Sequence, residues 1–192
     1  MPSSPPKGPL LIAGPARRYV EAMQTVTLRR IEMRDWQRIH EWASTDAACR
    51  FQPWGPNRPE DSEQFVADAL VAWQQQPIRR RVWAAESDEP GLVGLGELAV
   101  TSAKHRQGEI GYAVHLDWWG KGYGEAIARA LLQRGFGELG LHRITATCDP
   151  RNVASDRVLQ KVGMTHEGTL RGTHLLRDGW RDSNLYALVV DA

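Results

Sequence analysis

The stretch that decides the fold is Val114-His115-Leu116-Asp117-Trp118-Trp119-Gly120-Lys121-Gly122-Tyr123-Gly124-Glu125-Ala126, where an apolar, strand-like segment meets alternating glycines and then a helix-like segment. Glycines let the backbone approach a ligand closely, and the first turn of a helix carries N–H groups that no helical carbonyl satisfies. Those donors and the helix dipole favour a phosphate group. The stretch therefore indicates an anion site, with a purely structural turn from strand to helix as the alternative.

Two familiar phosphate motifs do not match this stretch. A P-loop requires Ser or Thr after Gly-Lys to bind magnesium, but Lys121 is followed by Gly122. A Rossmann fingerprint requires a third glycine three positions after the second and an early place in the chain. The missing magnesium ligand also argues against a plain nucleotide-binding protein.

The composition fits one domain. The chain has 192 residues, with 24 Lys and Arg against 23 Asp and Glu, for a net charge of +1. A chain of this length buries roughly 70% of its unfolded surface. The balanced charge gives no reason to expect nucleic acid or a membrane as a partner. Cys49 and Cys148 lie far apart without Cys-x-x-Cys spacing, so we expect neither a metal site nor a disulfide, and we expect a reducing cytoplasm.

The first 24 residues differ from the rest. Their only apolar run, 10–13, is shorter than a signal-peptide core or a membrane span requires. We expect residues 1–24 to form a disordered or loosely attached tail and residues 25–192 to form the domain. Met23 directly precedes the first strand-like segment, so it is an alternative start to Met1. Five prolines interrupt the tail: Pro2, Pro5, Pro6, Pro9 and Pro15.

Hydrophobic periodicity predicts a mixed α/β sheet of about seven strands with helices on both faces. The expected strands are 26–30, 78–86, 92–100, 108–116, 143–147, 164–175 and 180–190. The expected helices are 35–44, 61–76, the segment from 123 to the glycines at 137 and 140, and the segment from Asn152 to Gly163. The prolines of 49–59 predict an ordered loop. Arg79-Arg80-Arg81 is interpreted as a solvated charge run, with a ligand-binding role as the alternative.

This order of elements, together with three motifs, resembles the GCN5-related N-acetyltransferases over about residues 25–190. The glycine stretch resembles their acyl-CoA pyrophosphate loop, with Trp119 where Gln or Arg is usual, and its Trp-Gly-x-Gly-Tyr form is similar to the RimJ/RimL branch that acetylates ribosomal protein N-termini. Residues 152–164 resemble the family's Asn-x-x-Ser-x-x-Val-x-x-Lys-x-Gly-Phe segment, with Met164 for Phe. Residues 167–171 match the Glu-Gly-x-x-Arg that follows it in that branch.

The resemblance implies that acetyl-CoA lies in a cleft where the fourth and fifth strands splay apart, and it implies no metal. The backbone from Val114 to Leu116 would bind the pantetheine arm, and the glycine loop would bind the pyrophosphate. Asn152 is also interpreted as a plain helix cap, and Lys121 as an ordinary exposed lysine. The residues expected to hold the cofactor are Val114, Leu116, Trp119, Gly120, Lys121, Gly122, Tyr123, Gly124 and Asn152.

The resemblance also implies catalytic roles. Ser155 occupies the position of the general acid in RimL-like enzymes, and a backbone N–H near Leu116 would stabilise the oxyanion. His174 falls where those enzymes carry a catalytic Glu, and a histidine with a pKa of about 6.5 suits a general base. Glu109 and Glu97, on the central strands, are the alternatives for the base.

The implied reaction is direct transfer of acetyl to a primary amine in a ternary complex, and we expect a protein or peptide N-terminus as the acceptor. A small-molecule amine and a non-catalytic acyl-CoA-binding module are the alternatives, and a homodimer is an open possibility in this family. Glu97 and Trp54 are expected to bind the acceptor. Four tryptophans belong to the segments that wall this site in the family: Trp36, Trp42, Trp54 and Trp73. We interpret all but Trp54 mainly as core residues.

Overall fold

The computed structural model describes residues 24–88 and 91–190. The predicted tail, including Met23, lies outside the described residues apart from Gln24. Residues 89–90, between the second and third strands, also lie outside them. None of the helices in the described ranges is long and apolar enough to cross a membrane.

Seven strands form one mixed sheet in the order β1-β2-β3-β4-β5-β7-β6. Only the β4 and β5 pair is parallel, and every other neighbouring pair is antiparallel. This arrangement confirms the predicted fold class. The strands are β1 (Thr27–Arg30), β2 (Arg80–Ser87), β3 (Gly91–Ser102), β4 (Gln107–Val114), β5 (Arg143–Cys148), β6 (Thr165–Leu176) and β7 (Gly179–Val189).

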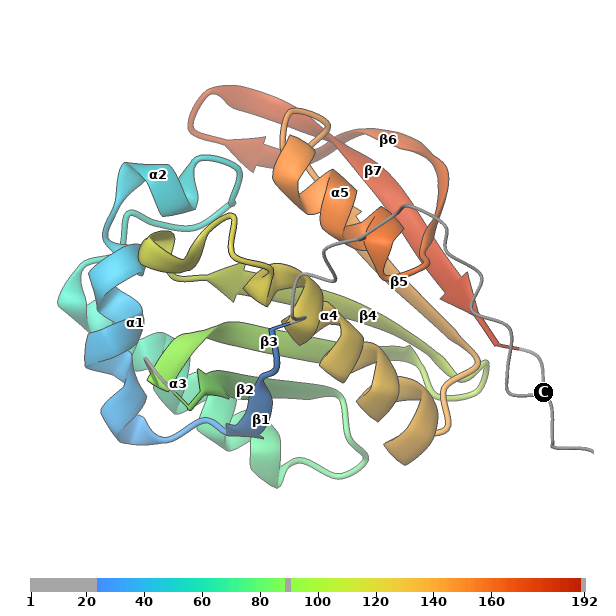
Figure 1. Cartoon of the computed structure of the whole chain (residues 1–192), viewed down its shortest axis with the longest axis horizontal. Coiled ribbons are helices and arrows are strands. Elements are labelled where there is room, and N and C mark those ends of the chain that lie inside the picture. Colours follow the sequence, from blue (N-terminus) through green and yellow to red (C-terminus); the bar gives the residue numbers. More distant parts are fainter. Residues whose placement is uncertain (1–23, 89–90, 191–192) are drawn as a thin grey trace, which may run out of the picture.

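Strands β4 and β5 diverge in the middle of the sheet. Their pairing extends only from Gln107, opposite Arg143, to Glu109, opposite Thr145. Beyond that point the two strands separate, as Figure 1 shows. The predicted splay between the fourth and fifth strands is therefore present.

Strand β4 ends at Val114, two residues before the predicted end. Leu116 instead begins a 3-10 turn, η2 (Leu116–Trp118). The cause is His115, whose buried imidazole Nδ1 accepts a hydrogen bond from the backbone N–H of Asp117 at 3.2 Å. This side-chain cap bends the chain at the end of an apolar run that otherwise favours a strand.

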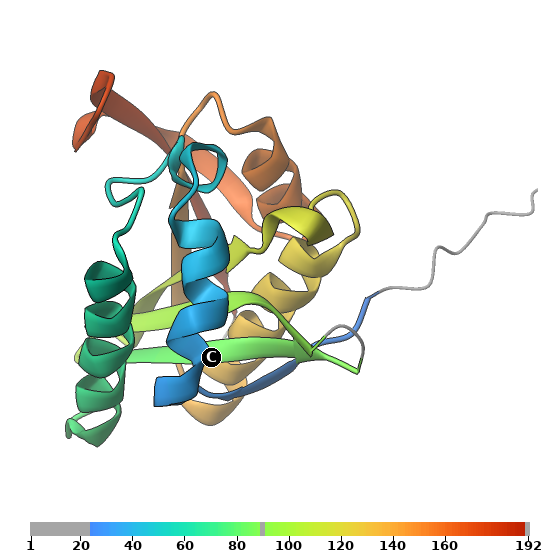
Figure 2. The same ribbon diagram turned by 90° about the vertical axis from the view of Figure 1, so that its left-hand side faces the viewer.

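Helices cover both faces of the sheet (Figure 2). On one face lie α1 (Trp36–Ala43) and α3 (Pro59–Gln74), and on the other lie α4 (Tyr123–Gln133) and α5 (Val153–Lys161). The third predicted helix is α-helical as far as Gln133, and a π-helical turn, η3 (Arg134–Glu138), follows it directly. Besides η2, two short elements were not predicted: η1 (Met33–Asp35) and α2 (Asp46–Cys49).

Two apolar clusters hold the sheet between these layers. On one face, Ile127 and Leu131 of α4 pack so closely on β3 that a Cβ at Gly96 would lie 3.1 Å from each side chain. On the other face, Trp42 of α1 belongs to the same cluster as Leu95 of β3. Strand β3 is therefore packed against helices on both faces of the sheet.

The interpretation of the arginine run as solvated is wrong for two of its members. Arg81 is only 5% exposed and donates to the carbonyl of Ala72 at 2.6 Å, near the end of α3. Arg80 is half-buried and bound to Glu97. The last carbonyls of a helix have no donor within the helix. The carbonyl of Ala72, near the end of α3, is therefore available to accept a hydrogen bond from Arg81 in place of water.

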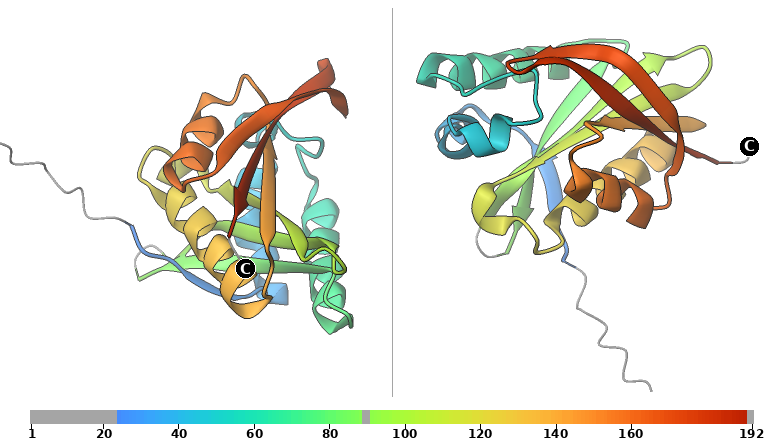
Figure 3. Two further views of the ribbon diagram at one scale, coloured as in Figure 1. Left: turned by 90° about the vertical axis from the view of Figure 1, so that its right-hand side faces the viewer. Right: turned by 90° about the horizontal axis from the view of Figure 1, so that it is seen from above.

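The β6–β7 hairpin reaches over the loop that follows α2 (Figure 3). Arg181 of β7 donates to the carbonyl of Phe51 at 2.8 Å. Arg177, in the hairpin turn, donates to the carbonyls of Cys49, at 3.2 Å, and of Gly55. The proline-containing loop is thus fixed to the opposite end of the sequence.

Candidate active site

The glycine loop combines left-handed backbone with a helix start. Gly120 and Gly122 have φ of +74° and +86°, a region that disfavours side chains. Gly122 caps α4, whose first hydrogen bond runs from the N–H of Ala126 to the Gly122 carbonyl at 3.1 Å. The N–H groups of Tyr123, Gly124 and Glu125 therefore have no partner within the helix. This end of α4 favours an anion.

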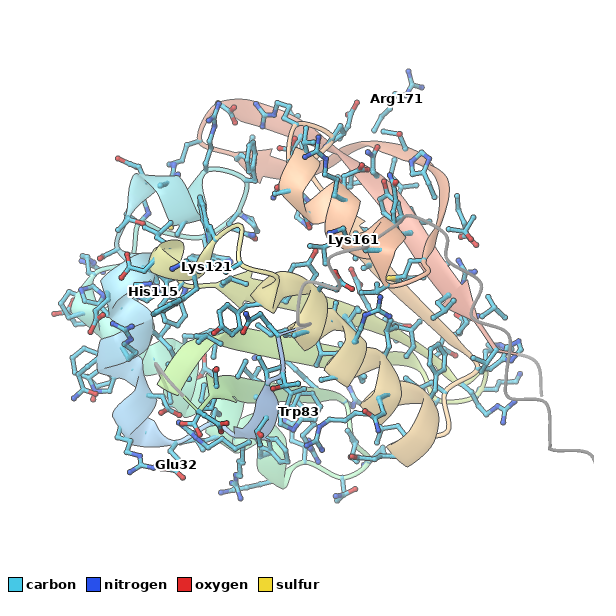
Figure 4. All side chains as sticks on the ribbon, in the orientation of Figure 1. Glu32, Trp83, His115, Lys121, Lys161 and Arg171 are labelled. Atoms are coloured by element: carbon cyan, nitrogen blue, oxygen red, sulfur yellow. The ribbon has the colours of Figure 1, made fainter. Side chains whose placement is uncertain are left out.

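Trp119 ties this loop to the end of β4. Its indole N–H donates to the carbonyl of Val114 at 2.8 Å. Beside it, the ammonium of Lys121 lies 4.2 Å from the ring centroid of Trp118. Figure 4 shows Lys121 near the start of α4. The loop therefore has a fixed attachment and a positive charge nearby.

The loop, α5 and β4 come together at Gly124. A Cβ at this position would lie 3.4 Å from Val158 of α5 and 3.6 Å from the ring of Tyr112 on β4. Glycine allows α4 to begin this close to both elements. The anion-favouring helix end therefore stands beside the opening between β4 and β5.

Ser155, near the start of α5, is held by two neighbours. The side-chain oxygen of Asn152 accepts the Ser155 N–H at 3.1 Å, which confirms Asn152 as the helix cap. The hydroxyl of Ser155 lies 2.9 Å from the phenol oxygen of Tyr112. Burial raises the pKa of Tyr112, so the phenol stays protonated at neutral pH. Contact of Asn152 with a cofactor stays a prediction.

Tyr112 is the functional candidate that the sequence did not reveal. It lies on β4 between Gly111 and Ala113, where a tyrosine is as typical of a core position as of a site. Its partner Ser155 is 43 residues away along the chain. The only local signal is that Tyr112 directly follows Glu109-Ile110-Gly111, next to the candidate base Glu109.

A cavity of about 650 Å³ opens on the α1 and α3 side of the sheet. Its walls come from these helices, the loop after α2 and strands β2, β3 and β4. Trp54, Glu97 and Tyr112 all line it, together with Trp42. Trp73 instead donates its indole N–H to the Val82 carbonyl at 2.9 Å. The structure thus brings both predicted acceptor-binding residues into one cavity.

The two strand carboxylates lie on the same face of the sheet. Glu97 pairs with Gly111 in the ladder, and Glu109 is two residues from Gly111 along β4. Arg80 donates to both oxygens of Glu97, at 2.7 and 2.9 Å. Burial raises the pKa of Glu109, the charge of Glu97 adds to this, and a hydrogen bond from Thr147 acts in the opposite direction.

His174 lies within the β6–β7 hairpin. Its Nδ1 is 3.1 Å from the hydroxyl of Thr173 and 3.1 Å from a guanidinium nitrogen of Arg181. Burial and the charge of Arg181 lower the pKa of His174, so the imidazole is neutral at neutral pH. Among the described residues that line the large cavity, neither His174 nor Glu109 is included.

The site therefore extends through the sheet at the splay. Tyr112 joins the two sides, because it lines the cavity and contacts Ser155 of α5. Carboxylates face the cavity side of the sheet, while hydroxyl groups and the glycine loop lie toward α4 and α5. Within residues 24–88 and 91–190, no cluster of His, Cys, Asp and Glu side chains is arranged to hold a metal ion.

Comparison with known proteins identifies the family. Residues 25–165 match the acetyltransferase (GNAT) domain family. The chain is 32% identical over 163 residues to an uncharacterized N-acetyltransferase, YnaD, of Bacillus subtilis, which covers 84% of this chain and 92% of that protein.

Two solved structures share the fold at about one-fifth identity. Spermidine N-acetyltransferase from Vibrio cholerae, in complex with CoA and spermine, superposes with a TM-score of 0.74 at 20% identity and covers 86% of this chain and 95% of its own. The ribosomal L7/L12 α-N-protein acetyltransferase RimL superposes with a TM-score of 0.75 at 20% identity. The match covers 86% of this chain and 91% of the RimL chain. On the family match and on its identity to YnaD, this chain belongs to the GNAT acetyltransferases and is an N-acetyltransferase.

Proposed function

We propose that the protein transfers acetyl from acetyl-CoA to the α-amino group of a protein or peptide N-terminus, in a ternary complex. The observation that carries the proposal is the junction at Tyr112. An aromatic-lined cavity on one face of the sheet meets a hydroxyl pair and a glycine loop on the other. Two reactants can thus enter from opposite faces and meet at the splay.

The residues of the splay fit acetyl-CoA. The free N–H groups at the start of α4 and the charge of Lys121 suit its pyrophosphate. The β4 backbone beyond Glu109, which β5 no longer pairs, suits the pantetheine arm as far as Val114 and Leu116. When bound, acetyl-CoA supplies the acetyl thioester. Trp119 keeps the glycine loop attached to this strand.

Ser155 is the proposed proton donor to the leaving thiolate, and Tyr112 is the residue that positions it. Ser155 Oγ gives its proton to the sulfur, and Tyr112 holds the serine hydroxyl in place through its own protonated phenol. Asn152 supports Ser155 from the helix cap. A backbone N–H near Leu116 is the proposed donor to the developing oxyanion.

Glu109 is the proposed general base. Its raised pKa makes it a stronger base than an ordinary glutamate, and it faces the same side of the sheet as the acceptor cavity. Arg80 occupies both oxygens of Glu97, and Arg181 and Thr173 contact the Nδ1 of His174. These contacts favour Glu109 over the other two candidates, with transfer directly or through one water.

The ionisation of the acceptor favours an N-terminus over a lysine side chain. An α-amino group has a pKa of about 8, so roughly a tenth of it is neutral near pH 7. A lysine with a pKa of about 10.4 would have to give up roughly 4.6 kcal/mol to become neutral. Glu109, a single half-buried carboxylate, is better suited to deprotonating an α-amino group than a lysine side chain. The two free, buried cysteines, Cys49 and Cys148, suit a reducing cytoplasm.

The test is release of free thiol from acetyl-CoA by the full chain. Acceptors would be unblocked peptides, the same peptides with a blocked N-terminus and an internal lysine, spermidine and an aminoglycoside. Turnover of the unblocked peptides alone is expected. Turnover of lysine peptides or small amines alone would overturn the N-terminal acceptor, and binding of CoA without turnover of any amine would overturn the reaction itself.

A further inference from the structure

We infer that the acceptor carries a large apolar or aromatic group next to its amine, as an N-terminal Leu or Phe does, and that it is not a polycation. This inference rests on the proposed function and specifies the substrate class of the same site. It comes from the lining of the 650 Å³ cavity.

The cavity walls are dominated by large apolar side chains. Six of them line it: Ile39, Trp42, Trp54, Phe65, Val82 and Leu95. They come from both helices of that face, from the loop after α2 and from the sheet. Apolar surface of this kind stabilises a ligand that buries apolar surface of its own. This apolar surface adds no binding free energy for an acceptor whose first residue is short and polar or acidic.

Both carboxylates among the described residues that line the cavity already contact an arginine. These carboxylates are Asp61 and Glu97. Glu97 is held at both oxygens by Arg80, and Asp61 accepts from the backbone N–H of Arg58 at 2.9 Å and from its side chain at 3.4 Å. A polyamine or aminoglycoside requires carboxylates that are free to pair with several ammonium groups.

The Glu97–Arg80 pair is itself fixed. The guanidinium of Arg80 lies 5.7 Å from the ring centroid of Phe65, so an aromatic side chain and a carboxylate hold it from two directions. Rotation of Arg80 away from Glu97 would lose both contacts. The ion pair with Arg80 therefore neutralises the charge of Glu97 within the folded cavity.

The wall that carries Trp54 is also held in place. Arg177 and Arg181 donate to carbonyls on both sides of Trp54, and the N–H of Asn57 donates to the Ala43 carbonyl at 2.8 Å. A wall that is already ordered loses little entropy when a ligand binds. Trp54 thus offers a fixed aromatic surface at 38% exposure.

The experiment measures kcat/KM for one peptide sequence in which only the first residue changes, to Phe, Leu, Ser or Gly, with spermidine alongside. Burial of a full apolar side chain predicts a preference of about tenfold to hundredfold for Phe and Leu over Ser and Gly. Spermidine should be the poorest acceptor. Equal rates across the series, or a preference for spermidine or Ser, would overturn the inference.

Two substitutions test the cause. Trp54→Ala should lower kcat/KM for the Phe and Leu peptides about tenfold more than for the Ser peptide. Trp180→Ala removes an indole that is 71% exposed on β7, and it should leave kcat/KM unchanged for every acceptor. Equal losses for Phe and Ser peptides in Trp54→Ala would contradict the inference.

Arg80→Gln frees the carboxylate of Glu97 and should raise the turnover of spermidine relative to the Phe peptide severalfold. An unchanged or lower ratio would contradict the role assigned to this pair. If the wild type releases no thiol with any amine, the proposed function fails. If it acetylates amines without regard to the first residue, only the present inference fails.

Discussion

The phenol oxygen of Tyr112 lies 2.9 Å from the hydroxyl oxygen of Ser155, and this contact joins strand β4 to helix α5 across the splay of the sheet. Tyr112 is also part of the wall of the large cavity. The pair is thus the structural link between the proposed acceptor side and the proposed cofactor side.

The first prediction concerns this pair. Ser155→Ala should lower kcat about 100-fold, because it removes the proposed donor to the thiol. Tyr112→Phe removes one hydrogen bond of about 1 kcal/mol and should lower kcat about fivefold. If the two act as a unit, the double variant will be no slower than Ser155→Ala alone. Steady-state thiol release measures all three.

The control for this prediction is the dissociation constant of CoA, measured by calorimetry. It should change less than twofold in each variant, since neither hydroxyl belongs to the proposed pyrophosphate site. Multiplicative losses in the double variant would show that Tyr112 and Ser155 act separately.

The second prediction concerns the base. Burial raises the pKa of Glu109 above its ordinary value of 4.5, so activity should fall as the pH drops through that raised value and the carboxylate becomes protonated. Glu109→Gln should remove this acid limb from the pH profile of kcat/KM and lower its plateau about 100-fold. His174→Gln and Glu97→Gln should keep the limb.

A second limb, near pH 8, belongs to the free amine and must remain in every active variant, which makes it an internal control. Loss of the acid limb in His174→Gln with its retention in Glu109→Gln would assign the base to His174 instead.

The positions of the strands and longer helices along the chain could be predicted from the sequence because local patterns specify them. Strand alternation, proline positions and the glycines after α4 and α5 mark the seven strands and four longer helices. The end of β4 could not be predicted, since a side-chain cap from His115 overrides an apolar run. The short helix α2 depends in the same way on Thr45, whose hydroxyl accepts the Ala48 N–H at 3.3 Å.

The site was only partly predictable for a different reason. The glycine loop and the Asn152 cap are local, so their residue types indicate them directly. The Tyr112–Ser155 and Arg80–Glu97 contacts join residues 43 and 17 positions apart, and they exist only because strands and helices pack in one particular register. No spacing in the sequence specifies such contacts.

The third prediction concerns stability. The pKa of His174 is lowered in the fold, so the unfolded chain binds a proton more readily than the folded one does. The corresponding stability is fully present above the unfolded pKa of about 6.5 and is lost as the pH falls through the lower folded value. The melting temperature of His174→Gln should therefore fall less than that of the wild type between pH 7 and pH 5.

The matched control is His105→Gln, which replaces an exposed histidine between β3 and β4. Its melting temperature should follow the wild type at each pH. Identical pH slopes for the wild type and His174→Gln would show that the Arg181 contact does not depend on the neutral imidazole.

The fourth prediction concerns Trp119, which takes the place of the polar residue usual at this point of the loop. Its indole N–H binds the Val114 carbonyl at 2.8 Å and so sets the distance between the glycine loop and the end of β4. Trp119→Phe replaces the indole with a smaller aromatic ring that has no N–H donor. Loss of a hydrogen bond of about 1 kcal/mol should raise KM for acetyl-CoA about fivefold and leave kcat nearly unchanged. Trp180→Phe, at the exposed surface of β7, should change neither constant. A fall in KM would mean instead that the indole competes with the cofactor for the Val114 carbonyl, because loss of a competitor strengthens binding whereas loss of a positioning contact weakens it.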